Sequence, residues 1–228
     1  MHTPLRSFRA AIFDLDGTLI DTEVLWKRTY TEMLEQSGKD RDPEIHARLM
    51  GKIPQDCADI LKQTYHFSGD TEELMRFREK TYQAIEQDSG VRVKPGAERL
   101  LNALVDAGIS LGLATGASRA YVDQIFTKNG WGKLFSVVLS IEDIPHGKPA
   151  PDIYLEAIAR LGCSSDEAIC FEDSPTGVLS AKRAGLKVVG VLDDRLIQAL
   201  PEADMVVGSL EEMTLARLNS CFFLSHAA

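Results

Sequence analysis

Two aspartates, Asp14 and Asp16, directly follow a short apolar run, and their spacing suits chemistry that needs paired carboxylates. The run from Ala10 to Phe13 is typical of a buried strand, and Gly17 follows the second aspartate as a turn residue. In open α/β sheets, ligands bind at the carboxyl ends of the strands. Asp and Gly are also ordinary turn residues. This stretch taken alone is therefore explained equally well by a strand followed by a polar turn that has no chemical role.

Polar residues follow further apolar runs in the same way. Residues 109–114, 136–139 and 168–171 read as strands, and the stretches after them contain Thr115, Gly116, Lys148, Glu172 and Asp173. In a parallel sheet these positions collect along one edge, together with Asp14 and Asp16. Each stretch alone is explained by a loop or a helix cap, and only their joint placement after successive strands indicates a site.

Four carboxylates at one edge need a compensating charge. Two carboxylates about 4 Å apart repel by roughly 4 kcal/mol at an effective dielectric near 20. Clustered carboxylate and carbonyl oxygens suit a hard divalent cation, so the pattern predicts a Mg2+ site.

The elements that position these residues fall into two blocks. Residues 21–92 show only helical patterns, with four amphipathic segments typical of a small bundle. From residue 93 onward, strand and helix patterns alternate, which predicts a parallel sheet covered on both faces. The expected fold class is therefore α/β, with a Rossmann-like core of residues 1–20 and 93–228. A helical domain of residues 21–92 is inserted after the first strand, with hinges at 19–22 and 90–95.

Composition excludes several classes of protein. The 228 residues carry a net charge of −9, which argues against nucleic acid as a main partner. No apolar run reaches the roughly 20 residues of a membrane helix, and the first residues lack the apolar core of a signal peptide. The four cysteines show no metal-ligand spacing, so we expect reduced thiols, a cytoplasmic location and no membrane partner. Oligomeric state is not readable from the sequence, and a monomer is the default expectation.

The motifs, in order, resemble those of the haloacid dehalogenase superfamily. The run Asp14-Leu15-Asp16-Gly17-Thr18 resembles its first motif, Thr115 its second, Lys148 its third and Glu172-Asp173 its fourth. The helical insertion resembles the helical cap of this family. The nearest branch by resemblance is that of the β-phosphoglucomutase-like phosphatases, which act on small phosphorylated metabolites.

The resemblance implies a mechanism. Asp14 attacks phosphorus and forms an aspartyl-phosphate, while Asp16 protonates the leaving alcohol and then takes a proton from the attacking water. Asp14, the backbone carbonyl of Asp16 and Asp173 would hold Mg2+, with Glu172 assisting. Thr115, Gly116 and Lys148 would hold the phosphate, and Thr18 would orient the acid or its loop. At a separation of about 4 Å, the repulsion between Asp14 and a phosphate dianion is roughly 8 kcal/mol at a dielectric of 20, so Mg2+ and Lys148 are needed to offset it.

Further residues are expected at the rim of the site. A lid formed by the helical domain excludes water and supplies substrate contacts. Lys52 lies between two helices of this domain, and Glu23 lies just past the first hinge. Ser118 and Arg119 follow the second motif, although Ser118 also reads as a helix cap. Trp26 is at least equally well explained as part of the helical domain's own core.

Two other functions stay open. A mutase of the β-phosphoglucomutase type would share the core residues, but that family usually has valine at the position of Thr18, a histidine near Trp26, and an arginine in the loop 51–55, which this chain lacks. A true dehalogenase is disfavoured because that branch lacks the second carboxylate, which Asp16 provides here. A non-catalytic binding protein on the same fold is the alternative from another class. Among phosphatase substrates, hexose phosphates, glycerol phosphates and pseudouridine 5′-phosphate all remain open, with sugar phosphates favoured.

Overall fold

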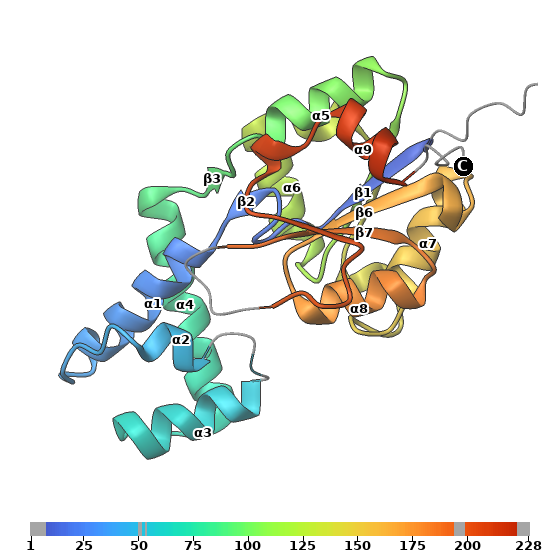
Figure 1. Ribbon diagram of the computed structural model, residues 1–228. Helices are drawn as coiled ribbons and strands as arrows, with labels where there is room; N and C mark the ends of the chain where they lie inside the picture. The colour runs from blue at the N-terminus through green and yellow to red at the C-terminus, as the bar shows by residue number, and fades with distance from the viewer. Residues whose placement is uncertain (1–7, 50–51, 53, 194–198, 223–228) are drawn as a thin grey trace, which may run out of the picture. The chain divides into compact units, whose positions relative to one another are not determined.

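The structure is a computed structural model that describes residues 8–49, 52, 54–193 and 199–222. The chain divides into two compact units (Figure 1). Unit 1 comprises Met1–Ile20 and Val93–Ala228, and unit 2 comprises Asp21–Arg92. Within the described residues, no helix is long and apolar enough to cross a lipid bilayer.

Unit 1 is built on a six-stranded parallel sheet with the order β5-β4-β1-β6-β7-β8. Its strands are β1 (Ala10–Phe13), β4 (Ser110–Ala114), β5 (Phe135–Leu139), β6 (Ala168–Glu172), β7 (Lys187–Val191) and β8 (Met205–Val207). The sheet confirms the predicted α/β class. The four residues of β1 are buried on both faces of the sheet, as expected for an uninterrupted apolar run in a central parallel strand.

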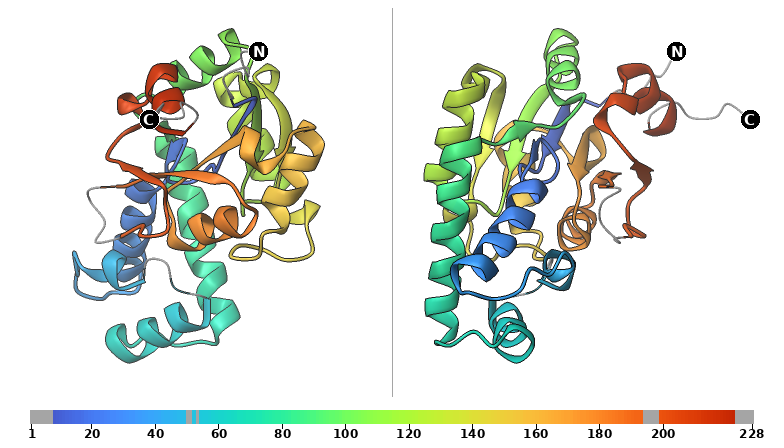
Figure 2. Two further views of the ribbon diagram at one scale, coloured as in Figure 1. Left: turned by 45° about the vertical axis from the view of Figure 1, so that its right-hand side comes forward. Right: turned by 90° about the vertical axis from the view of Figure 1, so that its left-hand side faces the viewer.

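Helices cover both faces of this sheet (Figure 2). On one face, α7 (Asp152–Leu161) and α8 (Pro175–Arg183) share a buried core with β1, β5, β6 and β7. The other face carries α5 (Ala97–Asp106) and α6 (Arg119–Asn129), and α9 (Leu215–Phe222) follows β8. Short 3-10 turns at Trp131–Lys133, Ile141–Asp143, Ser165–Glu167 and Leu210–Glu212 complete the unit. The sequence did not predict α9 as a helix.

The described residues of unit 2 form four helices joined by short non-helical segments, with strand residues only at the two ends of the unit. Its helices are α1 (Glu23–Gln36), α2 (Ile45–Leu49), α3 (Pro54–Tyr65) and α4 (Thr71–Ser89). They enclose a separate apolar cluster that includes Met33, Leu34, Leu61 and Leu74. The two short strands β2 (Ile20–Asp21) and β3 (Arg92–Val93) pair with each other where the chain passes between the units.

Side-chain caps define the starts of two helices. α4 begins at Thr71 and is capped by Asp70, whose side chain accepts from the backbone N–H of Glu73 at 2.8 Å. Glu73 in turn accepts from the N–H of Asp70, which completes a capping box. The predicted Ser118 cap of α6 is present, with its Oγ accepting from the N–H of Tyr121 at 3.3 Å. All four cysteines are free thiols, and Cys170 is buried in the core.

Candidate active site

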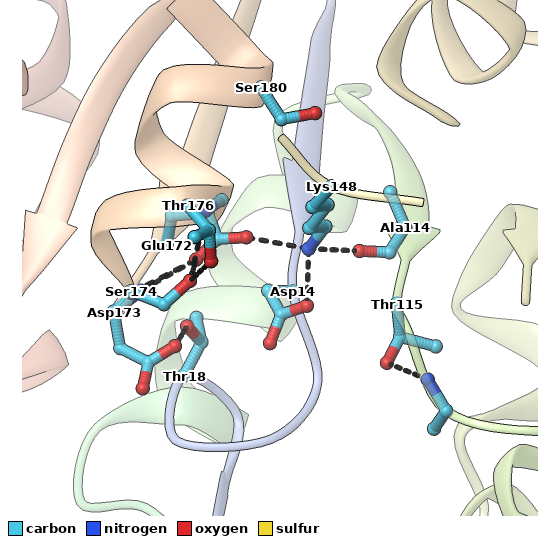
Figure 3. A network of polar contacts seen from close by, with 12 residues as sticks. Asp14, Thr18, Ala114, Thr115, Lys148, Glu172, Asp173, Ser174, Thr176 and Ser180 are labelled. Carbon is cyan, nitrogen blue, oxygen red and sulfur yellow. Dashed lines mark hydrogen bonds and ion pairs between the residues drawn. The ribbon is translucent and has the colours of Figure 1, made fainter. Parts of the chain in front are cut away.

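The predicted residues of the first, third and fourth motifs meet at the carboxyl end of the sheet (Figure 3). Asp14 follows β1, and its N–H donates to the carbonyl of Phe171 at 3.0 Å, which extends the ladder between β1 and β6 by one residue. The rings of Phe13 and Phe171 stack below it with centroids 4.5 Å apart. The N–H of Thr115 likewise donates to the carbonyl of Leu139 at 3.1 Å. Strand pairing therefore fixes the backbone from which these polar side chains project.

Lys148 lies at the centre of the cluster. Its Nζ donates to Asp14 Oδ1 at 2.6 Å, to Glu172 Oε1 at 2.5 Å and to the carbonyl oxygen of Ala114 at 3.0 Å. An ammonium group has three donors, so all of them are used. Burial alone would lower the pKa of Lys148, but the charges of Asp14 and Glu172 raise it above its ordinary value. Lys148 is therefore a fixed positive charge beside Asp14.

Asp14 is buried, with 7% of its surface exposed. The pKa of its carboxyl is raised to about 8, chiefly by burial; the charge of Lys148 acts to lower it and the charge of Glu172 acts to raise it. The single positive charge of Lys148 is therefore too small to offset the rise in the pKa of Asp14 that burial and the neighbouring carboxylates cause. A second positive charge at this place would favour the ionised form of Asp14 that a nucleophile requires.

Glu172, the last residue of β6, has no exposed surface and is saturated with donors. Its Oε1 accepts from Lys148 and from the hydroxyl of Tyr154 at 2.8 Å. Its Oε2 accepts from the N–H groups of Asp173 and Ser174 at 3.0 and 3.1 Å, and from the Ser174 hydroxyl at 3.1 Å. These contacts hold Lys148 and shape the loop that begins α8, so Glu172 acts in this structure as an anchor for its neighbours.

Asp173 faces the first motif. The hydroxyl of the fully buried Thr18 donates to Asp173 Oδ1 at 3.3 Å, so Thr18 orients this carboxylate. Gly17 adopts a φ of +77°, and a Cβ there would lie 1.9 Å from Asp173 Oδ2. Both the conformation and the close approach require glycine in the Asp-x-Asp-Gly turn. Asp16 lies in the same turn and is partly exposed, and its backbone pairs with Ile20.

The carboxylates form a group that fits a metal ion. One oxygen from each of Asp14, Glu172 and Asp173 lies within 4.8 Å of the others. The pKa of Asp173 is raised well above its ordinary value by burial and by the charges of Glu172 and Asp14. Three carboxylates in a buried site with one ammonium carry excess negative charge, and oxygen ligands of this kind suit Mg2+.

The residues of the second motif lie at the same end of the sheet. Thr115 is buried, and its Oγ1 accepts from the N–H of Ala117 at 3.0 Å. Gly116 is exposed, with no side chain or backbone atom within 4 Å of where a Cβ would be. The open backbone at Gly116 leaves room for a ligand to approach the loop closely.

Ser118 and Arg119 have structural contacts of their own. Ser118 caps α6, as described above. The guanidinium of Arg119 pairs with Asp143 and donates to the carbonyl of Val138 at 3.0 Å, and its backbone N–H contacts Glu142 at 3.1 Å. These contacts join α6 to the turn after β5. Substrate contact by Ser118 and Arg119 stays a prediction.

Two residues that hold the site were not identified as functional from the sequence. Tyr154 lies on the buried face of α7, where its hydroxyl donates to Glu172, and Lys148 Nζ lies 5.1 Å from its ring centroid. Ser174 caps α8 by accepting from the N–H of Gly177 at 3.0 Å, and its hydroxyl also donates to Glu172. The available signal was a tyrosine on a buried helix face, since a buried phenol needs a hydrogen-bond partner.

The two remaining predicted residues, Glu23 and Lys52, belong to unit 2. Both line a cavity within that unit. Trp26 lines the same cavity and packs against the apolar cluster of unit 2, with its ring stacked on Tyr82 at a centroid distance of 4.2 Å.

Comparison with known proteins agrees with this geometry. Residues 11–191 match the model of the haloacid dehalogenase-like hydrolase family. The validoxylamine A 7'-phosphate phosphatase of Streptomyces hygroscopicus subsp. limoneus is 30% identical over 206 residues, which cover 90% of this chain and 96% of that protein. The phosphorylated carbohydrates phosphatase of Thermotoga maritima is 30% identical over 186 residues, covering 80% of this chain and 85% of that protein.

A solved structure shares the fold over nearly the whole chain. The crystal structure of a HAD family hydrolase from Deinococcus radiodurans R1, with phosphate and sodium bound, superposes with a TM-score of 0.81. It is 25% identical, and the match covers 97% of this chain and 100% of that one. With these matches and the four motifs assembled at one sheet edge, the chain belongs to the haloacid dehalogenase-like hydrolase family, among its phosphatases.

Proposed function

We propose that this protein is a Mg2+-dependent phosphatase that hydrolyses small phosphate monoesters, chiefly sugar phosphates, through an aspartyl-phosphate on Asp14. The observation that carries the proposal is the ammonium of Lys148, held 2.6 Å from Asp14 and 2.5 Å from Glu172. A buried carboxylate beside a fixed cation is suited to attack a phosphate dianion, because the cation offsets the charge that opposes their approach.

In the first step, an Asp14 oxygen attacks phosphorus and the bond from phosphorus to the ester oxygen breaks. Asp16 gives its proton to the departing alkoxide, which leaves as an alcohol. In the second step, Asp16 takes a proton from water, and the resulting hydroxide attacks phosphorus and releases phosphate from Asp14. Throughout, Lys148 provides positive charge next to the reacting group, and Thr115 and the Gly116 N–H are proposed to hold the phosphate oxygens.

The residues present fit a Mg2+ ion, since three carboxylates share one ammonium in a buried cluster. Asp14, the carbonyl oxygen of Asp16 and Asp173 are the proposed ligands. A bound Mg2+ would supply positive charge that lowers the pKa of Asp14 and offsets the charge of the phosphate. The donors that already saturate Glu172 favour an anchoring role for it over direct ligation.

Sugar phosphates are the preferred class of substrate. The Thermotoga maritima relative is named for phosphorylated carbohydrates, and the Streptomyces relative is also a phosphatase. We propose that unit 2 acts as the cap, with Glu23 and Lys52 among its substrate contacts. We further propose a cytoplasmic monomer, to which the four free thiols and the net charge of −9 are well suited.

The test is phosphate release from a panel of sugar, polyol and nucleoside monophosphates, with Mg2+ and with EDTA. We expect metal-dependent release with a preferred ester, and its loss in Asp14→Asn, because the amide is a poor nucleophile. Equal activity of wild type and Asp14→Asn on purified protein would overturn the site assignment. A parallel reaction with β-glucose 1-phosphate and a bisphosphate primer tests the mutase alternative. Conversion to glucose 6-phosphate without phosphate release would replace the phosphatase proposal with the mutase one.

A further inference from the structure

Lys148 belongs to a short segment, residues 147–151, that we call the lysine loop. Two carbonyl oxygens of this loop, both just after Lys148, accept hydrogen bonds from side chains of α8. The hydroxyl of Ser180 donates to Ala150 at 2.6 Å, and Nη1 of Arg183 donates to Pro149 at 2.9 Å. Figure 3 shows Ser180 on α8, close to Lys148 and Glu172. The backbone that follows Lys148 is therefore tied to α8 at two successive residues.

The other backbone hydrogen bonds of the lysine loop are local. The N–H of Ala150 donates to the carbonyl of Gly147 at 3.0 Å, and the carbonyl of Pro151 accepts from the N–H of Tyr154 at 3.1 Å, in the first turn of α7. Such bonds give the loop its shape but do not fix its position against the sheet edge. Among the described residues, the side chains of α8 supply the hydrogen bonds that tie this backbone to a helix other than α7.

Ser180 is an unusual residue for its place in the fold. It lies inside α8 and has no exposed surface. Helix propensity favours alanine over serine there, and a buried hydroxyl without a partner would cost free energy. A serine inside a helix can donate to the carbonyl four residues earlier, but Ser180 donates to Ala150, which is 30 residues away. The hydrogen bond to the lysine loop is therefore what this hydroxyl contributes to the structure.

The same side of α8 also supports Glu172. Gly177, Ser180 and Arg183 are spaced three residues apart, which places them along one side of the helix. The carboxylate of Glu172 lies against Gly177. Because Glu172 pairs with Lys148, α8 contacts both partners of this ion pair: the carboxylate directly, and the ammonium through the backbone of the lysine loop.

We propose that Ser180 is a positioning residue for the phosphatase reaction: it holds the lysine loop so that the ammonium of Lys148 stays beside Asp14, and Arg183 supports the same loop. The inference rests on the proposed function, in which Lys148 offsets the negative charge of Asp14 and the phosphate. Ser180 acts through Lys148 and not on the substrate. A displacement of about 1 Å at reacting groups costs on the order of 100-fold in rate, and the loss of one tether causes part of such a displacement.

The experiment measures kcat and KM on the preferred ester at saturating Mg2+, at a temperature where every variant is folded. Ser180→Ala should lower kcat about tenfold and change KM less than about threefold, because the misplaced charge matters most in the transition state. Arg183→Met should lower kcat about threefold, since its hydrogen bond is exposed and weaker, and Arg183→Lys, which keeps a donor, should recover most of that loss. The matched control is Lys182→Gln, which removes an ion pair with Asp204 at 2.7 Å from the same helix. It should lower the melting temperature and keep the wild-type kcat.

Hydrogen exchange of the backbone amides of residues 147–155 gives a readout that does not depend on activity. Amides exchange through local opening, so the removal of a tether from the lysine loop raises their exchange rate. We expect faster exchange in this segment in Ser180→Ala and wild-type exchange in Lys182→Gln.

The inference is overturned if Ser180→Ala keeps the wild-type kcat or the wild-type exchange of residues 147–155. It is also overturned if Lys182→Gln loses as much kcat as Ser180→Ala, because any weakening of α8 would then lower activity. Equal kcat in Arg183→Lys and Arg183→Met would overturn the part assigned to Arg183. If Ser180→Ala fails to fold by circular dichroism, the two Arg183 variants decide the matter. Failure of the wild type to hydrolyse any ester would refute the proposed function and this inference together, whereas hydrolysis with unchanged kcat in Ser180→Ala refutes the inference alone.

Discussion

Gly177 lies so close to the carboxylate of Glu172 that a Cβ at Gly177 would be 1.7 Å from Oε1. The Glu172 side chain folds beneath the first turn of α8, where it accepts from the N–H groups of Asp173 and Ser174. Only a residue without a side chain leaves space for this arrangement. The contact with Lys148 therefore depends on a glycine that lies outside all four motifs.

Gly177→Ala is expected to reduce activity strongly. The methyl group would push the Glu172 carboxylate out of place and move Lys148 away from Asp14, and a displacement of about 1 Å at reacting groups costs on the order of 100-fold in rate. The measurement is kcat/KM on the preferred ester, with thermal unfolding recorded in parallel. Gly132→Ala is the matched control, because nothing lies within 4 Å of its Cβ position. Wild-type kinetics in Gly177→Ala would show that the position of Glu172 does not matter for the reaction.

The sequence predicted the sheet and the clustering of the motifs because both follow from the local pattern of apolar runs and the polar residues after them. Apolar runs such as residues 10–13 and 168–171 mark buried strands, and parallel strands bring the polar residues that follow them to one edge. The strand boundaries were accurate to within one residue for β1, β4, β5 and β6. The predicted cluster around Lys148 is present at hydrogen-bond distance.

The contacts that hold the motifs were not predictable in the same way. Tyr154 and Glu172 are 18 residues apart, and their pairing depends on how α7 packs against the sheet. Thr18 pairs with Asp173 across 155 residues. At the start of α4, Asp70 and Thr71 are both good cap residues, and the choice of Asp70 depends on a local geometry that residue type alone does not determine.

Tyr154→Phe tests whether the tyrosine positions Glu172. Removing the hydroxyl leaves a fully buried carboxylate oxygen with one donor fewer, so we expect a loss of about 1–2 kcal/mol in the free energy of unfolding. Activity should fall about tenfold, because the carboxylate that anchors Lys148 loses one of its supports. Tyr65→Phe is the control: it removes a comparable hydrogen bond, to Asp42 at 2.7 Å, from unit 2. Equal activity losses in the two variants would show that Tyr154 contributes only to the general stability of the fold and does not position Glu172.

Asp173→Asn tests the proposed metal site. The substitution removes one of the three clustered carboxylates but keeps an oxygen that can accept from Thr18. We expect Mg2+ to raise the melting temperature of the wild type, since a ligand that binds only the folded state stabilises it. The variant should need at least tenfold more Mg2+ for half of the maximal shift and for half-maximal activity. Asp106→Asn, an exposed position on α5, is the control. Identical Mg2+ dependence of Asp173→Asn and wild type would show that Asp173 is not a ligand of Mg2+.

Asp204, the residue just before β8, gives a test of stability against pH. Burial by itself would raise its pKa, but the hydrogen bonds from Lys182 at 2.7 Å and from the N–H of Val188 at 2.8 Å lower it below its ordinary value. A carboxyl whose pKa is lower in the folded state stabilises that state above its unfolded pKa, near 3.9, and this contribution is lost as pH falls through the folded pKa. Asp204→Asn should therefore lower the free energy of unfolding by about 1–2 kcal/mol between pH 5 and 7. The difference from wild type should shrink below pH 4. Urea unfolding at several pH values measures it, and a difference that stays constant down to pH 2 would show that the charge of Asp204 is not its cause.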